Sequence, residues 1–283
     1  MATLDFELPL TAQAYGRWRF ARDQALVEPA APGTRVPLPY LVFLRAQPIV
    51  GVDFHQWLGR DPDRGLYGGV AYREQRPLRV GQCLSARAEV TRRREVDSPR
   101  GRLTITTLLT RYLCDGVEHA TEEVRMIDLP PTPASAPTTA QTTAQTTAQT
   151  EAPAEVPPAE AGEPSHPLLA RVPPITRRQV AWLTVETGDV NPLHVDAGYA
   201  AQRGFPDVVV PATLITALLE REIAAATGRP VQAIDVRYHA PTYPGETIEL
   251  HAAPSGDPIE FQAIAGGRLR ADGSFRLQQD VRS

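Results

Sequence analysis

A carboxylate, a carboxamide and an imidazole lie close together on one short stretch of the sequence. Asp189, Asn191 and His194 follow Gly188, and the acid and the imidazole are five positions apart. An aspartate and a histidine held side by side can take a proton from a bound water and later return it, which is general acid–base chemistry. Glycine, aspartate, asparagine and proline are also the residues of an ordinary polar turn. The flanking elements are needed to separate the two interpretations.

Helix signals on both sides define this loop. Thr176 and Gln179 form a capping box, which predicts a helix from about 177 to 186. Gly188 supplies the left-handed residue that commonly ends a helix, so the acid is the first side chain beyond it. Asp196 can cap a second, short helix. The acid and the imidazole are therefore each held close to a helix end, as a site with preorganised geometry requires.

An apolar helix is predicted after the loop, from Pro211 to Ala226. Proline suits the first helical position. Apolar residues recur on one face at helical spacing: Leu214, Ile215, Leu218, Leu219 and Ile223. This pattern is typical of a core helix packed on a sheet. The free N–H groups at its start, including that of Ala212, can stabilise developing negative charge.

Together these segments resemble a known family. The motif reads Gly188-Asp189-x-Asn191-Pro192-x-His194-x-Asp196, then Tyr199-Ala200, Gly204-Phe205 and Val209-Val210 before the apolar helix. It closely resembles the hydratase motif of the MaoC-like enoyl-thioester hydratases and dehydratases. Further on, Tyr238, Pro241 and Pro244-Gly245-Glu246-Thr247 resemble the strand signature of the same family. The resemblance covers about residues 175 to 250.

The resemblance implies a role for each matching residue. Asp189 and His194 would jointly activate one water, Asn191 would orient the loop, and the backbone N–H of Ala212 would face the thioester oxygen. The implied substrate-binding positions are Gly188, Phe205, Val210 and Pro211.

One departure concerns the start of the apolar helix. Family members usually have His-Gly where this chain has Pro211-Ala212. Ala212 keeps the backbone N–H but adds a methyl group, so the oxyanion hole is expected to be narrower and the activity weakened or altered.

The function implied by the resemblance is reversible hydration of trans-2-enoyl thioesters, or dehydration of (R)-3-hydroxyacyl thioesters, without a metal or an organic cofactor. The substrate would be an acyl-CoA or an acyl carrier protein thioester, as in fatty acid metabolism. Two alternatives stay open. A hotdog thioesterase would need an acid on the central helix, where the chain has only Glu220 and Glu222. A non-catalytic acyl-binding or partner subunit would fit the Pro211-Ala212 departure.

Composition limits the class of protein further. The 283 residues carry a net charge of -4, which gives no basic footprint for nucleic acid. All 29 basic residues are arginine, so lysine-based Schiff-base chemistry is excluded. Cys83 and Cys114 lack metal-ligand spacing, no apolar run approaches a membrane span, and no signal-peptide layout is present. We expect a cytoplasmic protein that binds no membrane and is a monomer or a homodimer.

Between the two halves the composition changes abruptly. Three copies of Thr-Thr-Ala-Gln fill 138 to 149, and without a hydrophobic period such a segment cannot offset the entropy of ordering. We therefore predict a disordered linker over 129–164. The resemblance implies that it joins a degenerate N-terminal hotdog domain over 1–128 to a catalytic hotdog domain over 165–283. Asp53 and His55, in the first of these, are interpreted as structural or surface groups.

Each half places helices before strands, which indicates an α+β fold rather than alternating βαβ units. The first half has helices expected over 11–24 and from 39, and Pro77 and Gly81 there correspond to Pro241 and Gly245, each 164 residues later. Strands are expected over 85–94, 102–114, 117–127, 246–253, 259–265 and 275–279, with a hairpin turn at Asp115-Gly116 and a turn over 271–274. The resemblance implies a double hotdog: two antiparallel sheets, each wrapped around a central helix and joined edge to edge.

Overall fold

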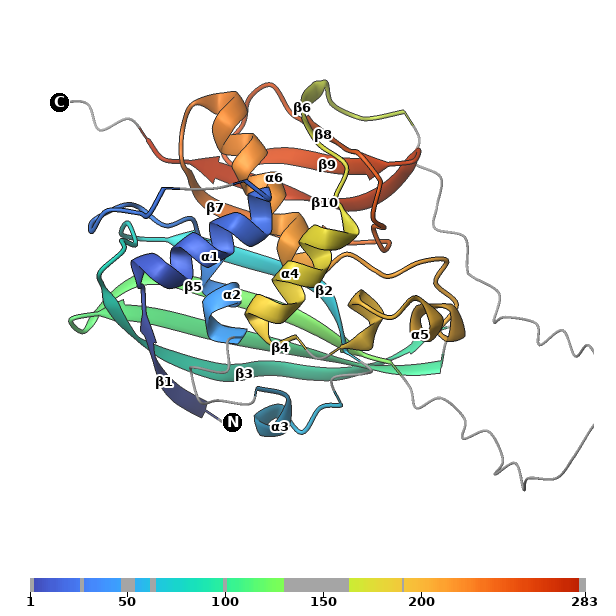
Figure 1. Cartoon of the computed structure of the whole chain (residues 1–283), viewed down its shortest axis with the longest axis horizontal. Helices are drawn as coiled ribbons and strands as arrows, with labels where there is room; N and C mark the ends of the chain where they lie inside the picture. Colours follow the sequence, from blue (N-terminus) through green and yellow to red (C-terminus); the bar gives the residue numbers. More distant parts are fainter. Residues whose placement is uncertain are drawn as a thin grey trace, which may run out of the picture.

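A computed structural model describes residues 3–25, 28–46, 54–61, 65–98, 101–129, 163–189 and 191–279. The strands are β1 (Thr3–Pro9), β2 (Gly65–Glu74), β3 (Cys83–Ser98), β4 (Gly101–Cys114), β5 (Val117–Asp128), β6 (Leu168–Val172), β7 (Val231–Tyr238), β8 (Ile248–Ala252), β9 (Ile259–Ala265) and β10 (Arg268–Leu277). They form one 10-stranded sheet in the order β1-β3-β4-β5-β2-β7-β10-β9-β8-β6 (Figure 1).

The sheet consists of two matching halves. Read from either edge inwards, the order β1-β3-β4-β5-β2 corresponds to β6-β8-β9-β10-β7. The halves join where β2 pairs antiparallel with β7, for example Val70 opposite Val236. This seam pairs the two inner edges, so neither is left exposed. The α+β double-hotdog architecture with sheets joined edge to edge is confirmed.

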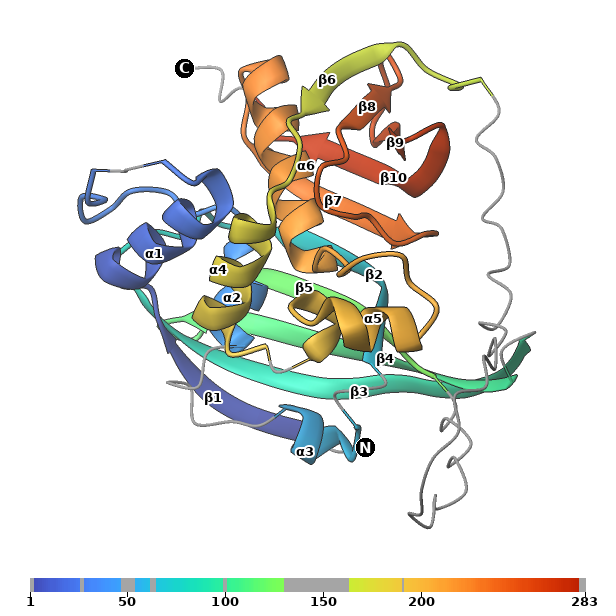
Figure 2. The same ribbon diagram turned by 45° about the vertical axis from the view of Figure 1, so that its right-hand side comes forward.

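The helices are α1 (Ala12–Asp23), α2 (Tyr40–Ala46), α3 (Phe54–Leu58), α4 (Arg177–Thr187), η3 (Pro192–His194), α5 (Ala197–Gln202) and α6 (Ala212–Thr227). In Figures 1 and 2, α1, α2, α4 and α6 lie on the same side of the curved sheet. Leu214, Leu218 and Leu219 of α6 are buried in the core between this helix and the strands. Among the described helices, none is long and apolar enough to cross a membrane.

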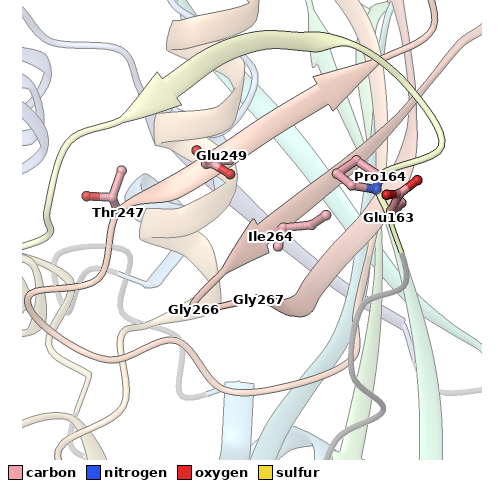
Figure 3. Close-up of a pocket in the computed structure, with 7 residues that line it drawn as sticks. All are labelled: Glu163, Pro164, Thr247, Glu249, Ile264, Gly266 and Gly267. Atoms are coloured by element: carbon pink, nitrogen blue, oxygen red, sulfur yellow. The ribbon is translucent and has the colours of Figure 1, made fainter.

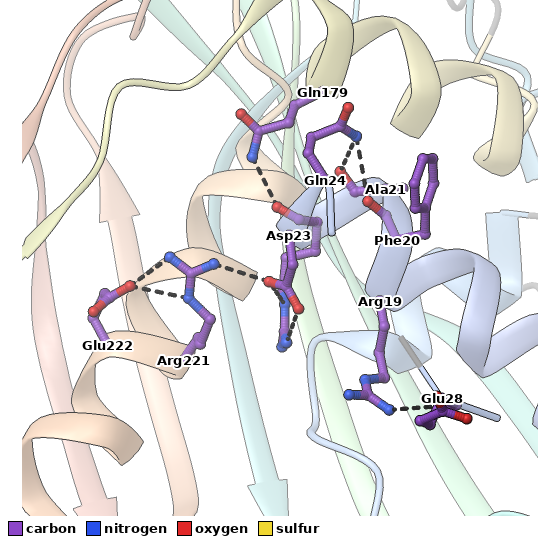
Figure 4. A network of polar contacts seen from close by, with 10 residues as sticks. Arg19, Phe20, Ala21, Asp23, Gln24, Glu28, Gln179, Arg221 and Glu222 are labelled. Atoms are coloured by element: carbon purple, nitrogen blue, oxygen red, sulfur yellow. Dashed lines mark hydrogen bonds and ion pairs between the residues drawn. The ribbon is translucent and has the colours of Figure 1, made fainter. Parts of the chain in front are cut away.

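Helices of the two halves are tied together by polar contacts (Figure 4). Arg221 of α6 donates to the Asp23 carboxylate at the end of α1, at 2.9 Å. Gln179 of α4 donates to the backbone carbonyl of Arg22, at 2.8 Å. Helix α1 of the N-terminal half therefore contacts both α4, which ends at the predicted catalytic loop, and α6.

The local signals of the sequence are mostly confirmed. The capping box of Thr176 and Gln179 is present at the start of α4. Asp196 caps α5 by accepting from the Tyr199 N–H. Asp115 and Gly116 both have positive φ in the turn between β4 and β5, as a type I′ hairpin requires. Four strands, β1, β2, β6 and β7, were not predicted, although Tyr238 at the end of β7 belongs to the strand signature.

One predicted turn was wrong. Residues 271–274 lie inside β10, which runs unbroken from Arg268 to Leu277 between β7 and β9. The reversal instead falls at Gly266 and Gly267, both with positive φ. Gly273 is required by close packing and not by a turn, since a Cβ there would lie 1.8 Å from the Asp235 carbonyl oxygen of β7.

The domain boundaries stay predictions. Nearly all of the predicted linker over 129–164 lies outside the described residues, as do the side chains of Asp53 and His55.

Candidate active site

Asp189 is positioned by the end of α4. Gly188 adopts the left-handed conformation there, with φ 65. The Asp189 N–H then donates back to the Thr184 carbonyl at 3.1 Å. The helix therefore ends at Gly188, as predicted. The hydrogen bond from the Asp189 backbone to the last turn of the helix fixes the position of this first residue beyond it.

The loop that follows is stabilised by its own polar side chains. The Asp189 carboxylate accepts the Asn191 N–H at 3.0 Å, and the Asn191 side-chain oxygen accepts the Leu193 N–H at 3.0 Å. Asn191 thereby caps the 3₁₀ turn η3, which ends at His194. The predicted role of Asn191 as the residue that orients the loop is consistent with this geometry.

The two nitrogens of the His194 ring face different groups. Nδ1 lies 2.6 Å from the Val209 carbonyl oxygen, and Nε2 lies 3.5 Å from Asp189 Oδ2. A carbonyl oxygen only accepts, so Nδ1 must carry the proton. In the neutral ring Nε2 is therefore the basic nitrogen, and its lone pair faces the carboxylate.

This arrangement suits a shared water molecule. A lone pair and a carboxylate oxygen repel each other, whereas a water that donates one proton to each satisfies both. The Asp189 side chain is 33% exposed and that of His194 is 13% exposed, so water reaches the pair from the Asp189 side. The acid and the imidazole predicted from the sequence are brought together.

The start of α6 lies beside the imidazole. Val209, whose carbonyl meets His194, is three residues before Ala212, and the Val210 N–H donates to the Thr242 carbonyl at 2.8 Å. Pro211 precedes the helix without a side-chain cap. The N–H of Leu214 bonds back to the Pro211 carbonyl at 3.0 Å.

Within the helix, the N–H groups of Ala212 and Thr213 therefore have no acceptor, because they precede the first helical hydrogen bond. They form a small, positively polarised donor pair at the helix start.

The N-terminal half reaches the loop through β2, which the sequence did not reveal. The Asn191 side-chain amide donates to the Gly65 carbonyl at 3.4 Å. Leu66 packs against a small apolar cluster that includes Leu193 and Phe205. Neither Gly65 nor Leu66 stands in a recognisable pattern, so only the fold places them at the site.

The predicted substrate-binding residues take different positions. Gly188 ends α4, and Phe205 is buried in the small cluster beside the loop. The Val210 side chain belongs to the main core, and Pro211 is buried at the start of α6. Their contact with a substrate stays a prediction.

A surface pocket of about 440 Å³ lies elsewhere, over β8 and β9 (Figure 3). Its lining residues are Glu163, Pro164, Thr247, Glu249, Ile264, Gly266 and Gly267. None of the predicted catalytic residues is among them, and Glu249 is already bonded to Arg171 at 3.1 Å. This pocket is therefore separate from the candidate active site.

The acids of the central helix lie far from the helix start. Glu222 is paired with Arg221, and Glu220 is only 7% exposed. Burial raises the pKa of Glu220 to about 7, an effect that Arg22 and Arg35 oppose. Glu220 is eight positions along the helix from Ala212, roughly 12 Å at 1.5 Å per residue. Neither acid is placed to act on a thioester bound at the helix start. Across the described residues, no three His, Cys, Asp or Glu side chains gather as metal ligands would.

Comparison with known proteins shows which family model and which solved structures the chain is similar to. The family model described as a MaoC like domain matches residues 160–268. HtdX of Mycobacterium tuberculosis has a similar structure, with 19% identity and a TM-score of 0.69, over 98% of this chain and 100% of that chain. A MaoC-like dehydratase from Phytophthora capsici has 17% identity and a TM-score of 0.69, over 100% and 97% of the two chains.

A second Mycobacterium tuberculosis protein, described as having a double hotdog fold, is similar over 98% of this chain and 96% of its own, with 17% identity and a TM-score of 0.59. At these identities the likeness concerns the fold.

Proposed function

Because residues 160–268 of the chain match the family model of the MaoC like domain, we propose that the protein reversibly hydrates trans-2-enoyl thioesters. In the other direction it dehydrates (R)-3-hydroxyacyl thioesters. The acyl group is carried by coenzyme A or by an acyl carrier protein, and no cofactor takes part.

The observation that carries this proposal is the orientation of the imidazole. Its Nδ1 is occupied by the Val209 carbonyl, and its Nε2 faces Asp189 at 3.5 Å. A general base needs a free lone pair within reach of the water that it deprotonates. His194 Nε2 has that lone pair, and Asp189 supplies a second acceptor that fixes the water.

The reaction follows from these groups. The water oxygen bonds to C3 while its proton passes to the His194–Asp189 pair. The electrons of the double bond move to the thioester oxygen, giving an enolate. The N–H of Ala212, at the start of α6, stabilises this charge. The proton held by the pair is then delivered to C2, which completes hydration. Dehydration runs through the same steps in reverse.

The test is incubation of the full chain with crotonyl-CoA, with longer enoyl-CoA thioesters, and with the corresponding acyl carrier protein thioesters. Loss of enoyl absorbance without free thiol is the expected result, and a dehydrogenase specific for the R or the S product assigns the configuration. Release of thiol would instead identify a thioesterase. Inactivity with every chain length and both carriers would leave a non-catalytic acyl-binding subunit, the alternative favoured by Pro211-Ala212.

A further inference from the structure

A tyrosine from the sheet contacts the first turn of the central helix. Tyr238, the last residue of β7, donates its hydroxyl to the Ala212 carbonyl at 2.8 Å. The same hydroxyl is hydrogen-bonded to the side chain of Thr216, one turn along α6. Thr216 is completely buried. The aromatic ring alone would fill this position in the sheet, so the hydroxyl needs a separate explanation.

Both hydroxyls of this pair lie within reach of the Ala212 carbonyl, which can only accept. In one arrangement Tyr238 donates to the carbonyl at 2.8 Å, and Thr216 donates to Tyr238. In the other, Thr216 donates to the carbonyl at 3.3 Å, and Tyr238 donates to Thr216. Burial raises the pKa of Tyr238, so the phenol remains protonated at neutral pH. In both arrangements the Ala212 carbonyl accepts a hydrogen bond from the Tyr238–Thr216 hydroxyl pair.

This hydroxyl pair acts on an N–H group that has no acceptor within α6. The Ala212 carbonyl and the Thr213 N–H belong to the same planar peptide, on opposite sides of it. Holding the carbonyl therefore fixes the direction of the N–H. Consecutive hydrogen bonds also polarise one another, by about 10–30% per bond, so a carbonyl that accepts from this hydroxyl pair makes the Thr213 N–H a stronger donor.

We propose that Tyr238 and Thr216 are positioning residues that orient and polarise the Thr213 N–H as a second oxyanion donor, beside that of Ala212. The inference rests on the proposed hydratase function. It also addresses the departure at the helix start, since a second aligned donor compensates for the crowding that the Ala212 methyl introduces.

The first measurement is steady-state hydration of crotonyl-CoA by the full chain, or of the longer enoyl-CoA that the wild type accepts. Loss of a whole oxyanion donor costs about 10²- to 10³-fold in kcat. Tyr238→Phe only loosens and weakens one of two donors, so a smaller fall in kcat, on the order of 5- to 20-fold, is expected, with KM changed less than about twofold. Thr216→Val should also lower kcat, whereas Thr216→Ser, which keeps a hydroxyl, should have the kcat of the wild type.

A spectroscopic measurement separates positioning from simple packing. Butyryl-CoA has no double bond to hydrate, and its thioester carbonyl stretch, measured by infrared difference spectroscopy, moves to lower frequency when oxyanion donors bind it. The shift should be smaller in Tyr238→Phe than in the wild type. Tyr112→Phe is the matched control, because it also removes a buried phenol hydrogen bond, to Glu122 in the N-terminal half. It should lower stability without changing kcat or the carbonyl frequency.

The outcomes are distinguishable. A wild type that hydrates enoyl-CoA while Tyr238→Phe and Thr216→Val keep full kcat and the full carbonyl shift would overturn the inference and leave the proposed function intact. A wild type that neither hydrates enoyl thioesters nor shifts the butyryl-CoA carbonyl would overturn both. If Tyr238→Phe does not fold, the comparison of Thr216→Val with Thr216→Ser decides alone.

Discussion

Replacing the Asp189 carboxylate with an amide tests the water-binding pair with little disturbance of the loop. Asp189 Oδ1 accepts the Asn191 N–H at 3.0 Å, and in Asp189→Asn the amide oxygen can accept the same bond. Weakening this hydrogen bond costs about 1 kcal/mol of stability at most, since the side chain is partly exposed and solvent compensates. The fold should therefore survive the change.

The effect on chemistry is much larger. In the variant an NH₂ group replaces Oδ2, 3.5 Å from His194 Nε2 in the wild type. This NH₂ donates to the lone pair, so the imidazole is occupied and the water loses both acceptors. Loss of a general acid or base lowers turnover by about 10²- to 10⁴-fold, which is roughly 3 to 5 kcal/mol of transition-state stabilisation. His194→Ala should fall in the same range. The double variant should be little worse than either, because the two residues act as a unit.

The assay is enoyl-CoA hydration followed by the loss of enoyl absorbance, with circular dichroism and thermal unfolding as measures of the fold. Asp196→Asn is the matched control, since Asp196 lies two residues beyond His194, is exposed and only caps α5. Asparagine caps helices equally well, so this variant should keep wild-type turnover. Wild-type turnover in a folded Asp189→Asn protein would remove Asp189 from the mechanism. An equal loss in the control would assign the effect to loop structure.

Three further changes test other parts of the structure. Ala212→Gly keeps the N–H and removes the methyl, so turnover should stay the same or rise; a loss with the fold intact would refute the oxyanion assignment. Burial raises the Glu220 pKa from 4.5 to about 7. The free energy of unfolding is therefore highest below pH 4.5, where the carboxyl is protonated in both the folded and the unfolded protein, and it falls as the pH rises to about 7. Between pH 4.5 and 8, Glu220→Gln should therefore gain up to about 3 kcal/mol relative to the wild type in urea unfolding; a constant difference would contradict this. Gly273→Ala should cost at least about 2 kcal/mol, because its Cβ would lie 1.8 Å from a backbone oxygen, whereas Gly16→Ala has open space and should be neutral or stabilising.

The features that the sequence predicted well depend on neighbouring residues. The capping box at Thr176, the left-handed Gly188 and the hairpin at Asp115-Gly116 each need only a few adjacent positions, and all three are present. The meeting of Asp189 with His194 is also local, since one turn of 3₁₀ helix separates them. Local signals of this kind are independent of the rest of the fold, which is why they can be read without it.

The features that escaped prediction depend on distant partners. β2 contains Gly68 and Gly69 and is paired on both sides, so it lacks the alternation by which a half-exposed strand is recognised. Gly273 has the composition of a turn, but its small size is required by the neighbouring strand β7. A single sequence cannot distinguish a glycine that bends the chain from one that lets two backbones approach.

The catalytic loop shows how these two kinds of information combine. Its chemistry is local, but its position is held by both halves of the protein. Asn191, which caps η3, also donates to the Gly65 carbonyl 126 residues away, and Leu66 packs on the apolar cluster beneath the loop. Because β2 also pairs with β7, the strand that joins the two sheets is the same strand that contacts the loop. The sequence of the N-terminal half contains no Asp-x4-His spacing, yet its strand at the seam contacts the loop on which the proposed chemistry depends.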